Sequence, residues 1–143
     1  MKLSIIGVGL IGGSIALKLK EQGLINYVYG VDYNEQHLEE ALEIGIINEK
    51  ANLSEAIAKS DIIVVAIPVD AAKIVLPKIL DLINPQQTVI DVGSTKAGIT
   101  AAVKEHANRG RYVAFHPMWG TENSGPKSAQ IDSFSERAAV ICN

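Results

Sequence analysis

The chain has 143 residues, of which 48% are hydrophobic, and its formal net charge is −3. This length and this apolar fraction fit one ordinary globular domain with a substantial core. The 13 lysine and arginine residues are scattered and form no basic run, so nucleic acid is not an expected partner. No apolar stretch approaches the roughly 20 residues of a membrane-spanning helix, so we expect no membrane partner either.

A single cysteine, Cys142, excludes an internal disulfide bond. This cysteine usage fits the reducing cytoplasm. The first strand is expected to begin near Lys2, which leaves no room for a signal peptide and also favours a cytoplasmic protein.

Short apolar runs alternate with segments of helical periodicity along the first half of the chain. Gly23 and Gly45 are expected to end the first two helices, Asn34 to cap the second helix and Ser54 to cap the third. The pattern predicts strands at residues 3–8, 27–32 and 45–47, the last being a minor one, and helices at 10–23, 35–45 and 55–60.

The second half of the chain continues this alternation. The strand predicted at 61–68 is apolar on both faces, which is typical of a central parallel strand. Pro77 falls inside the next helix, where it removes a hydrogen bond, so we expect a kink there or two short helices. The predicted strands are 61–68, 88–93, 112–116 and 138–142, and the predicted helices are 70–83 and 95–110.

The order of these elements, with short connections, predicts an α/β fold: a Rossmann-type, doubly wound and mainly parallel sheet with helices on both faces. We expect residues 1–143 to form one such domain. In sheets of this kind, ligands bind at the carboxyl ends of the strands. The residues at those predicted ends are Gly7, Asp32, Pro68, Gly93, Ser94 and His116.

The segment "GVGLIG", residues 7–12, fits the pattern G-x-G-x-x-G between a predicted strand and a predicted helix, as a dinucleotide-binding loop requires. Gly7 suits the tight turn, Gly9 the close approach of a pyrophosphate and Gly12 the packing of helix on strand. The free N–H groups and the positive end of the helix favour the phosphate charge. The predicted cofactor-binding residues are Gly7, Gly9, Leu10, Ile11, Gly12, Asp32, Pro68, Gly93 and Ser94.

Asp32 stands at the end of the second predicted strand, 20 residues after Gly12. A carboxylate at this place accepts hydrogen bonds from the adenosine ribose and repels the additional phosphate of NADP. The predicted cofactor is therefore NAD. The alternative is an aspartate that only begins the turn before the Asn34 cap.

A second group of polar residues follows the later strands, where the nicotinamide end of a bound dinucleotide is expected. Ser94 suits a contact with the cofactor or a cap of the following helix, and the two roles are compatible. Lys96 is expected to be a solvated residue of the first helical turn. His116 closes its strand and, taken alone, is more readily explained as a satisfied polar residue than as a catalytic one. Trp119 suits a buried anchor of the glycine-rich loop that follows.

Three segments carry a resemblance to a known family: "GVGLIGGSIA", "DVGSTKAGI" and "HPMWGTENSG". In this order and spacing they resemble the prephenate dehydrogenase family, which also includes arogenate and cyclohexadienyl dehydrogenases. The first segment is shared by many dehydrogenases, whereas the third is specific. The resemblance runs from Lys2 to the end of the chain and covers the family's N-terminal, nucleotide-binding domain.

The resemblance implies an enzyme of tyrosine biosynthesis that oxidises and decarboxylates prephenate to 4-hydroxyphenylpyruvate with NAD and without a metal. It also implies that His116 accepts the hydrogen bond of the substrate hydroxyl and that Ser94 lies between this histidine and the nicotinamide. Thr121 and Glu122 correspond to polar residues at the rim of the substrate pocket. A neutral imidazole suits the acceptor role near pH 7, because its ordinary pKa lies close by.

Members of this family continue into a helical domain that forms the homodimer and supplies cationic groups for the substrate carboxylates. The resemblance therefore implies that residues 1–143 alone bind NAD with little or no turnover. Trp119 departs from the family, since many members have a small residue there.

Three alternatives remain open. An arogenate dehydrogenase would share all of these motifs. Another dehydrogenase or imine reductase with a Rossmann-type domain would explain the glycine loop and Asp32, but not the spacing of Ser94, His116 and Glu122. A non-catalytic module that senses NAD would need no histidine at the nicotinamide end of the site.

Overall fold

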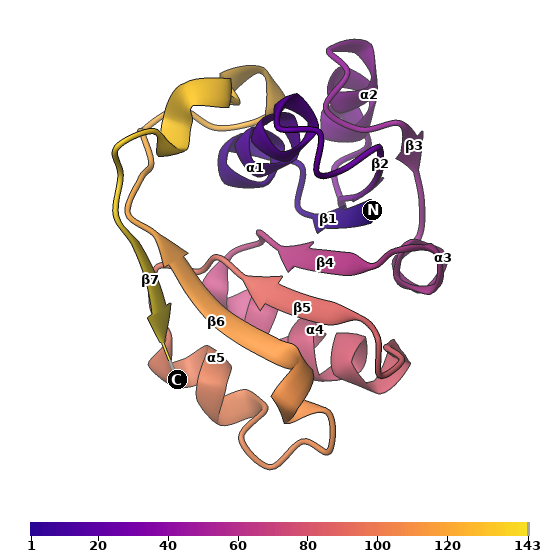
Figure 1. The fold of residues 1–143 in the computed structure, drawn as a ribbon, viewed down its shortest axis with the longest axis vertical. Helices are drawn as coiled ribbons and strands as arrows, with labels where there is room; N and C mark the ends of the chain where they lie inside the picture. Colours follow the sequence, from indigo (N-terminus) through magenta and orange to yellow (C-terminus); the bar gives the residue numbers. More distant parts are fainter. Residues whose placement is uncertain (143) are drawn as a thin grey trace.

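The computed structural model describes residues 1–142, which form a seven-stranded sheet with helices on both faces (Figure 1). The strands are β1 (Lys2–Ile6), β2 (Tyr27–Val31), β3 (Glu49–Lys50), β4 (Ile62–Val65), β5 (Thr88–Asp91), β6 (Tyr112–Pro117) and β7 (Ala139–Cys142). Their order across the sheet is β3-β2-β1-β4-β5-β6-β7. All neighbours pair in parallel except β7, which is antiparallel to β6. The predicted doubly wound, mainly parallel α/β fold is confirmed.

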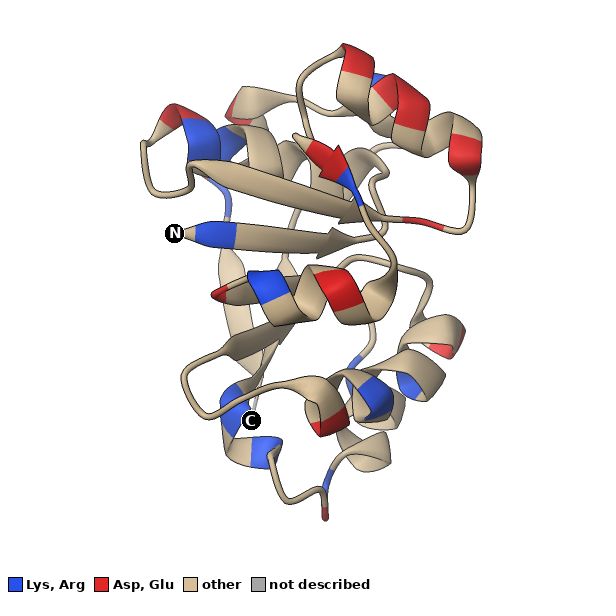
Figure 2. Ribbon diagram, turned by 90° about the vertical axis from the view of Figure 1, so that its right-hand side faces the viewer, with Lys and Arg blue, Asp and Glu red and all other residues tan. Residues whose placement is uncertain are grey.

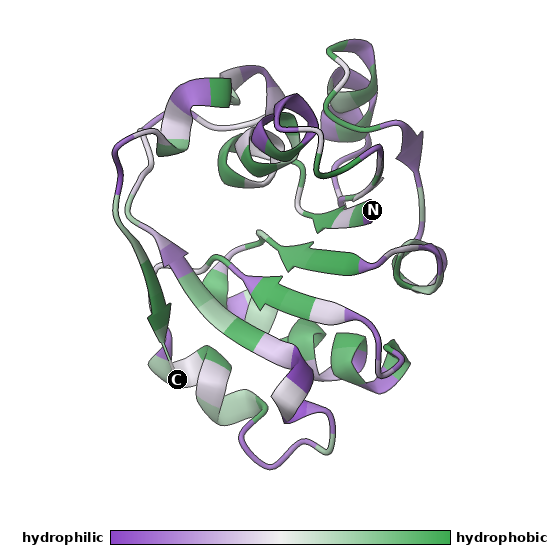
Figure 3. Cartoon of the chain, in the orientation of Figure 1, coloured by the Kyte–Doolittle hydropathy of each residue, from purple (hydrophilic) through white to green (hydrophobic). Residues whose placement is uncertain are grey.

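Two layers of helices cover the sheet and close an apolar core on each face. The helices are α1 (Leu10–Glu21), α2 (Glu35–Glu43), α3 (Leu53–Lys59), α4 (Val69–Leu82) and α5 (Ala97–Ala102), with short 3₁₀ turns η1 (Arg109–Arg111), η2 (Pro126–Ser128) and η3 (Ile131–Phe134). Figure 1 shows α1 and α2 on one side of the sheet and α4 and α5 on the other. The central strand β4 is apolar along its whole length (Figure 3), as expected for a strand buried on both faces.

The first two helices begin at the predicted residues, and each ends two residues before the glycine that was predicted to stop it. Gly23 and Gly45 follow α1 and α2 with positive φ angles of 69° and 76°, which glycine adopts without a steric penalty. The Asn34 side chain caps α2 by accepting hydrogen bonds from the amides of Gln36 and His37. These helix ends therefore follow from local chemistry.

Two predictions in the middle of the chain are wrong. Asn52, and not Ser54, caps α3, because its side chain and that of Glu55 form a reciprocal capping box. The minor strand is β3 at Glu49–Lys50 instead of 45–47, because the backbone amides of residues 45–47 bond back to carbonyl oxygens of α2.

Two helices of the second half also differ from the prediction. The helix α4 runs as one element through Pro77, so the alternative of two short helices is wrong, whereas the alternative of a kink stays a prediction. Its packing compensates for the lost hydrogen bond, since Leu76 and Ile79 beside the proline are fully buried. The helix α5 spans Ala97–Ala102 and not 95–110, and its glycine and β-branched residues have low helix propensity.

Most charged residues lie on the outside of the fold, whereas Asp91 is fully buried. Figure 2 shows acidic residues gathered on α2, whereas lysines and arginines are spread over separate elements. Within residues 1–142, no helix is long and apolar enough to cross a membrane. The same residues contain no group of three or more His, Cys, Asp and Glu side chains that could hold a metal ion.

Candidate functional site

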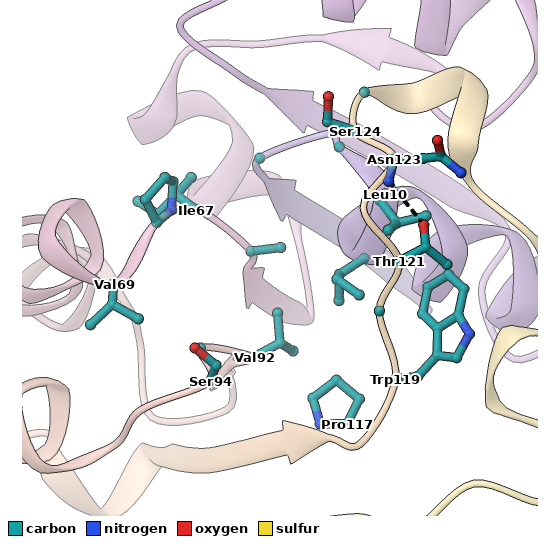
Figure 4. A pocket seen from close by; sticks show the side chains of 18 of the residues that line it. Leu10, Ile67, Val69, Val92, Ser94, Pro117, Trp119, Thr121, Asn123 and Ser124 are labelled. Carbon is teal, nitrogen blue, oxygen red and sulfur yellow. Dashed lines mark hydrogen bonds between the residues drawn. The ribbon is translucent and has the colours of Figure 1, made fainter.

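A cleft of about 490 Å³ follows the carboxyl ends of the parallel strands. In Figure 4, Ile67, Val69 and Ser94 lie on one side of this cleft, and Trp119, Thr121 and Asn123 lie on the other. Most of the predicted site residues line it: Gly7, Gly9, Leu10, Ile11, Asp32, Pro68, Gly93, Ser94, His116 and Thr121. The fold thus joins the glycine loop and His116, which are more than 100 residues apart in the sequence, in one site.

Two predicted residues are not in the lining of this cleft. Gly12 lies behind the loop, where an added Cβ would overlap the carbonyl oxygen of Gly7 and approach Ile5 to 2.8 Å. Its predicted role in helix-on-strand packing is thus visible in the structure. Glu122 is exposed and lines neither this cleft nor the hollow beside it, so its role at the substrate rim stays a prediction.

The glycine loop is shaped to receive an anion. Gly7 has a φ of 98°, and an added Cβ would lie 2.5 Å from the carbonyl oxygen of Ala66, so a side chain is excluded there. Gly9, by contrast, faces open space, since a Cβ added there would have no heavy atom within 4 Å beyond its chain neighbours. The helix that follows has no side-chain cap and no acidic residue in its first turn. Its amides and its dipole are therefore available to a phosphate group.

The turn predicted as the alternative role of Asp32 is present, and its contact with the adenosine ribose stays a prediction. Its carboxylate accepts one hydrogen bond from the Val8 amide, at 3.0 Å, and one from the Asn34 amide, at 2.9 Å. The second bond makes the turn before α2, and the first ties the end of β2 to the glycine loop. The side chain is only 7% exposed, yet it lines the cleft. Each carboxylate oxygen has a second lone pair, so the group can still accept a hydrogen bond from a ligand.

A buried ion pair lies beneath the loop that follows β5. The carboxylate of Asp91 is fully buried and accepts hydrogen bonds from the Tyr112 hydroxyl at 2.6 Å, the Lys96 ammonium at 2.6 Å and the Gly93 amide at 2.9 Å. The Lys96 side chain is 12% exposed, so the prediction of a solvated lysine is wrong. Burial and the neighbouring Asp91 carboxylate raise the pKa of Tyr112 above its ordinary value. Sequence reasoning missed this cluster, which fixes the backbone of Gly93 next to Ser94.

Ser94 is not the cap of the following helix. That position is taken by Lys96, whose side chain makes no capping hydrogen bond. Ser94 is exposed at the wall of the cleft, and within residues 1–142 no hydrogen bond joins it to His116. Its expected place between the histidine and the nicotinamide therefore remains a prediction.

His116 lies near the end of β6, where its backbone pairs with Val140 of β7. The side chain is partly buried, and no side chain of the described part of the chain hydrogen-bonds its imidazole. His116 lines the cleft and also a second hollow of about 410 Å³, together with Met118, Trp119, Gly120, Thr121 and Arg137. Both ring nitrogens are therefore available to a ligand.

The segment after His116 crosses the cleft toward the glycine loop. Trp119 packs edge-on against Phe134, with ring centroids 5.6 Å apart, in line with the predicted anchor role, although it is only partly buried. Farther along, the Gln130 amide donates a hydrogen bond of 2.9 Å to the Ser14 hydroxyl on α1. Several other residues of the lining carry no motif that predicts them, and these are Tyr33, His37, Asn123, Ser124 and Gly125.

Comparison with known proteins identifies the family. The family described as "Prephenate dehydrogenase, nucleotide-binding domain" matches residues 15–143. The chain belongs to the prephenate dehydrogenase family. A curated prephenate dehydrogenase of Lactococcus lactis is 31% identical over 143 residues, which cover 98% of this chain and 40% of the relative. The resemblance inferred from the three motifs is thereby confirmed, as is the nucleotide-binding character of the domain.

Solved structures of the family agree closely with this fold. The crystal structure of prephenate dehydrogenase from A. aeolicus in complex with hydroxyphenyl propionate and NAD+ gives a TM-score of 0.89 at 26% identity, over 100% of this chain and 50% of that one. The structure of Synechocystis arogenate dehydrogenase gives 0.86 at 29% identity, over 99% of this chain and 49% of that one. The chain therefore spans half or less of the length of these relatives.

Proposed function

We propose that the protein containing this domain oxidises prephenate with NAD, releases carbon dioxide and leaves 4-hydroxyphenylpyruvate. The observation that carries this proposal is the single cleft that joins a glycine loop suited to a phosphate group with His116 at the end of β6. A dinucleotide-binding loop alone is common to many dehydrogenases. A histidine that lines the same cleft gives the site an acceptor for a hydroxyl proton.

The residues of the loop and of β2 suit NAD. Gly9 and the uncapped start of α1 would hold the pyrophosphate, and Asp32 would accept a hydrogen bond from the adenosine ribose. The buried carboxylate of Asp32 disfavours the additional phosphate of NADP by charge repulsion. When bound, NAD supplies the acceptor for the hydride that leaves the substrate carbon bearing the hydroxyl group.

His116 has the chemistry that the alcohol oxidation needs. A neutral imidazole near pH 7 draws the hydroxyl proton away as the carbon becomes carbonyl-like, and it can return a proton to the phenolate once carbon dioxide has left. The pairing of β6 with β7 holds the backbone of His116 in place. Ser94, which faces Trp119 and Thr121 across the cleft (Figure 4), would orient the ring or the substrate, and Thr121 and Glu122 would lie at the rim.

Arogenate is the second candidate substrate. It carries an amino acid side chain where prephenate carries a keto acid, and the reacting ring is the same. The Synechocystis neighbour, described as an arogenate dehydrogenase, supports this candidate. We further propose a cytoplasmic homodimer in which a second, helical domain completes the substrate site, so that residues 1–143 alone bind NAD with little turnover.

Turnover by the complete gene product tests the proposal. The protein is incubated with prephenate or arogenate and with NAD or NADP, and reduced cofactor is followed by absorbance. We expect NADH to form from prephenate and little reduced cofactor with NADP. A folded protein that binds NAD but oxidises neither acid would contradict the proposed function and leave the nucleotide site standing.

A further inference from the structure

The second hollow adjoins the proposed reaction site. His116, Trp119, Gly120 and Thr121 line both this hollow and the cleft. The imidazole is thus reached from the cleft, where the nucleotide is proposed to bind, and from the hollow. A substrate whose hydroxyl group contacts His116 while its ring faces the cofactor would extend its side chain into this space.

Arg137 gives this hollow a positive charge. Among the residues described, its guanidinium forms no ion pair within 4.0 Å and no side-chain hydrogen bond, and no acidic side chain lines the hollow. The other two arginines of the chain are engaged elsewhere: Arg109 donates to the carbonyl of Tyr112 at 3.0 Å and Arg111 to that of Gln87 at 2.8 Å. Arg137 is exposed, and among the described residues it is the arginine whose five guanidinium donors have no protein partner.

The backbone around Arg137 is fixed relative to His116. The Met118 amide donates to the carbonyl oxygen of Ala138 at 3.0 Å, next to the pairs that β6 and β7 form. Glu136, directly before Arg137, has a φ of 58°, and it is the one non-glycine residue within 1–142 with a positive φ. Such a conformation is uncommon for an L-residue, and strained residues of this kind cluster at active sites and ligand clamps. Here the turn leads the chain into β7 with Arg137 at the edge of the hollow.

We propose that Arg137 binds a carboxylate of the substrate in this hollow. The inference rests on the proposed function and adds a binding group for the acid within the nucleotide-binding domain itself. A guanidinium matches a carboxylate with two parallel hydrogen bonds. The bound carboxylate is that of the three-carbon side chain, which the product keeps. An arginine on the departing carboxylate would stabilise the ground state and oppose the loss of carbon dioxide.

This assignment predicts which compounds depend on Arg137. Prephenate, arogenate and hydroxyphenyl propionate all carry a side-chain carboxylate, so the residue recognises the acid and does not distinguish keto from amino substrates. A neutral amide of hydroxyphenyl propionate lacks the charge and should bind independently of Arg137.

The test compares Arg137→Gln and Arg137→Lys with Lys104→Gln in the complete protein. Lys104 is an exposed cation away from the hollow, so its variant is matched in net charge. In Arg137→Gln we expect the KM for prephenate and the Kd for hydroxyphenyl propionate, measured by calorimetry with NAD present, to rise about tenfold to a hundredfold. Arg137→Lys should recover part of the affinity that Arg137→Gln loses for prephenate and for hydroxyphenyl propionate. The Kd values for NAD and for the neutral amide should not change.

Two outcomes would overturn the assignment. One is an unchanged KM and an unchanged Kd for hydroxyphenyl propionate in Arg137→Gln, while the wild type turns over normally. The other is an equal weakening by Lys104→Gln, which would indicate a long-range effect of net charge and not a contact. If the wild type oxidises neither prephenate nor arogenate, the proposed function itself fails, and the role of Arg137 fails with it.

Discussion

The buried pair of Lys96 and Asp91 allows a quantitative prediction. Replacing Lys96 by methionine keeps most of the aliphatic stem and removes the ammonium group, which lies 2.6 Å from a fully buried carboxylate. Removing one partner of a buried ion pair costs about 3–5 kcal/mol. Asp91 would keep two donors, the Tyr112 hydroxyl and the Gly93 amide. We therefore expect the lower end of that range, about 3 kcal/mol of unfolding free energy.

A matched control separates burial from charge. Lys73 also pairs with an aspartate, Asp70, at 2.9 Å, but these two side chains are 40% and 95% exposed. Lys73→Met should cost no more than about 0.5 kcal/mol. Urea unfolding followed by circular dichroism measures both variants, and with an m-value of about 2 kcal/mol per molar the Lys96→Met midpoint should fall by about 1.5 M. Equal losses in the two variants, or a loss under about 1 kcal/mol for Lys96→Met, would refute this account of Asp91.

Two further predictions concern the glycine loop and the response to alkaline pH. Gly12→Ala should lower the free energy of unfolding in urea by about 1–3 kcal/mol, because its Cβ would overlap the Gly7 carbonyl. Gly9→Ala should unfold like the wild type, but calorimetry should show that it binds NAD about tenfold more weakly. Unchanged NAD affinity in Gly9→Ala would contradict the role of this glycine. Burial and Asp91 raise the pKa of Tyr112, so the folded protein holds a proton that the unfolded chain releases above about pH 10, and stability should fall as pH rises beyond that point. In Tyr112→Phe, the urea midpoint should fall less steeply than in the wild type as pH rises above about 10. An equally steep fall in both proteins would contradict the role of the Tyr112 proton.

Much of the fold follows from rules that act over a few residues. The loop from Gly7 to Gly12, the Asn34 cap and the apolar strand β4 each depend on near neighbours in sequence, so the sequence predicts them. The cap of α3 is harder to assign, because Asn52 and Ser54 both have suitable side chains and the path of the backbone decides between them.

Parts of the candidate site depend on contacts between distant segments. A lysine beside a glycine-rich turn is normally solvated, whereas Lys96 donates to the buried Asp91, whose carboxylate also accepts from Tyr112 of the next strand. Arg137 reaches the hollow beside His116 because β7 pairs with β6 across a connection of about 20 residues. No local pattern encodes either arrangement, which is why composition and periodicity did not point to them.

The most direct test of the proposed chemistry is the rate of NADH formation from saturating prephenate and NAD by the complete protein, in wild type and in His116→Asn. His106→Asn serves as the control, since His106 pairs with the exposed Asp81 and lies outside the cleft. We expect His116→Asn to lower kcat by about 10²–10⁴-fold while the Kd for NAD stays unchanged, and His106→Asn to behave as wild type. A His116→Asn protein that retains wild-type turnover would contradict the assignment of His116 as the proton acceptor.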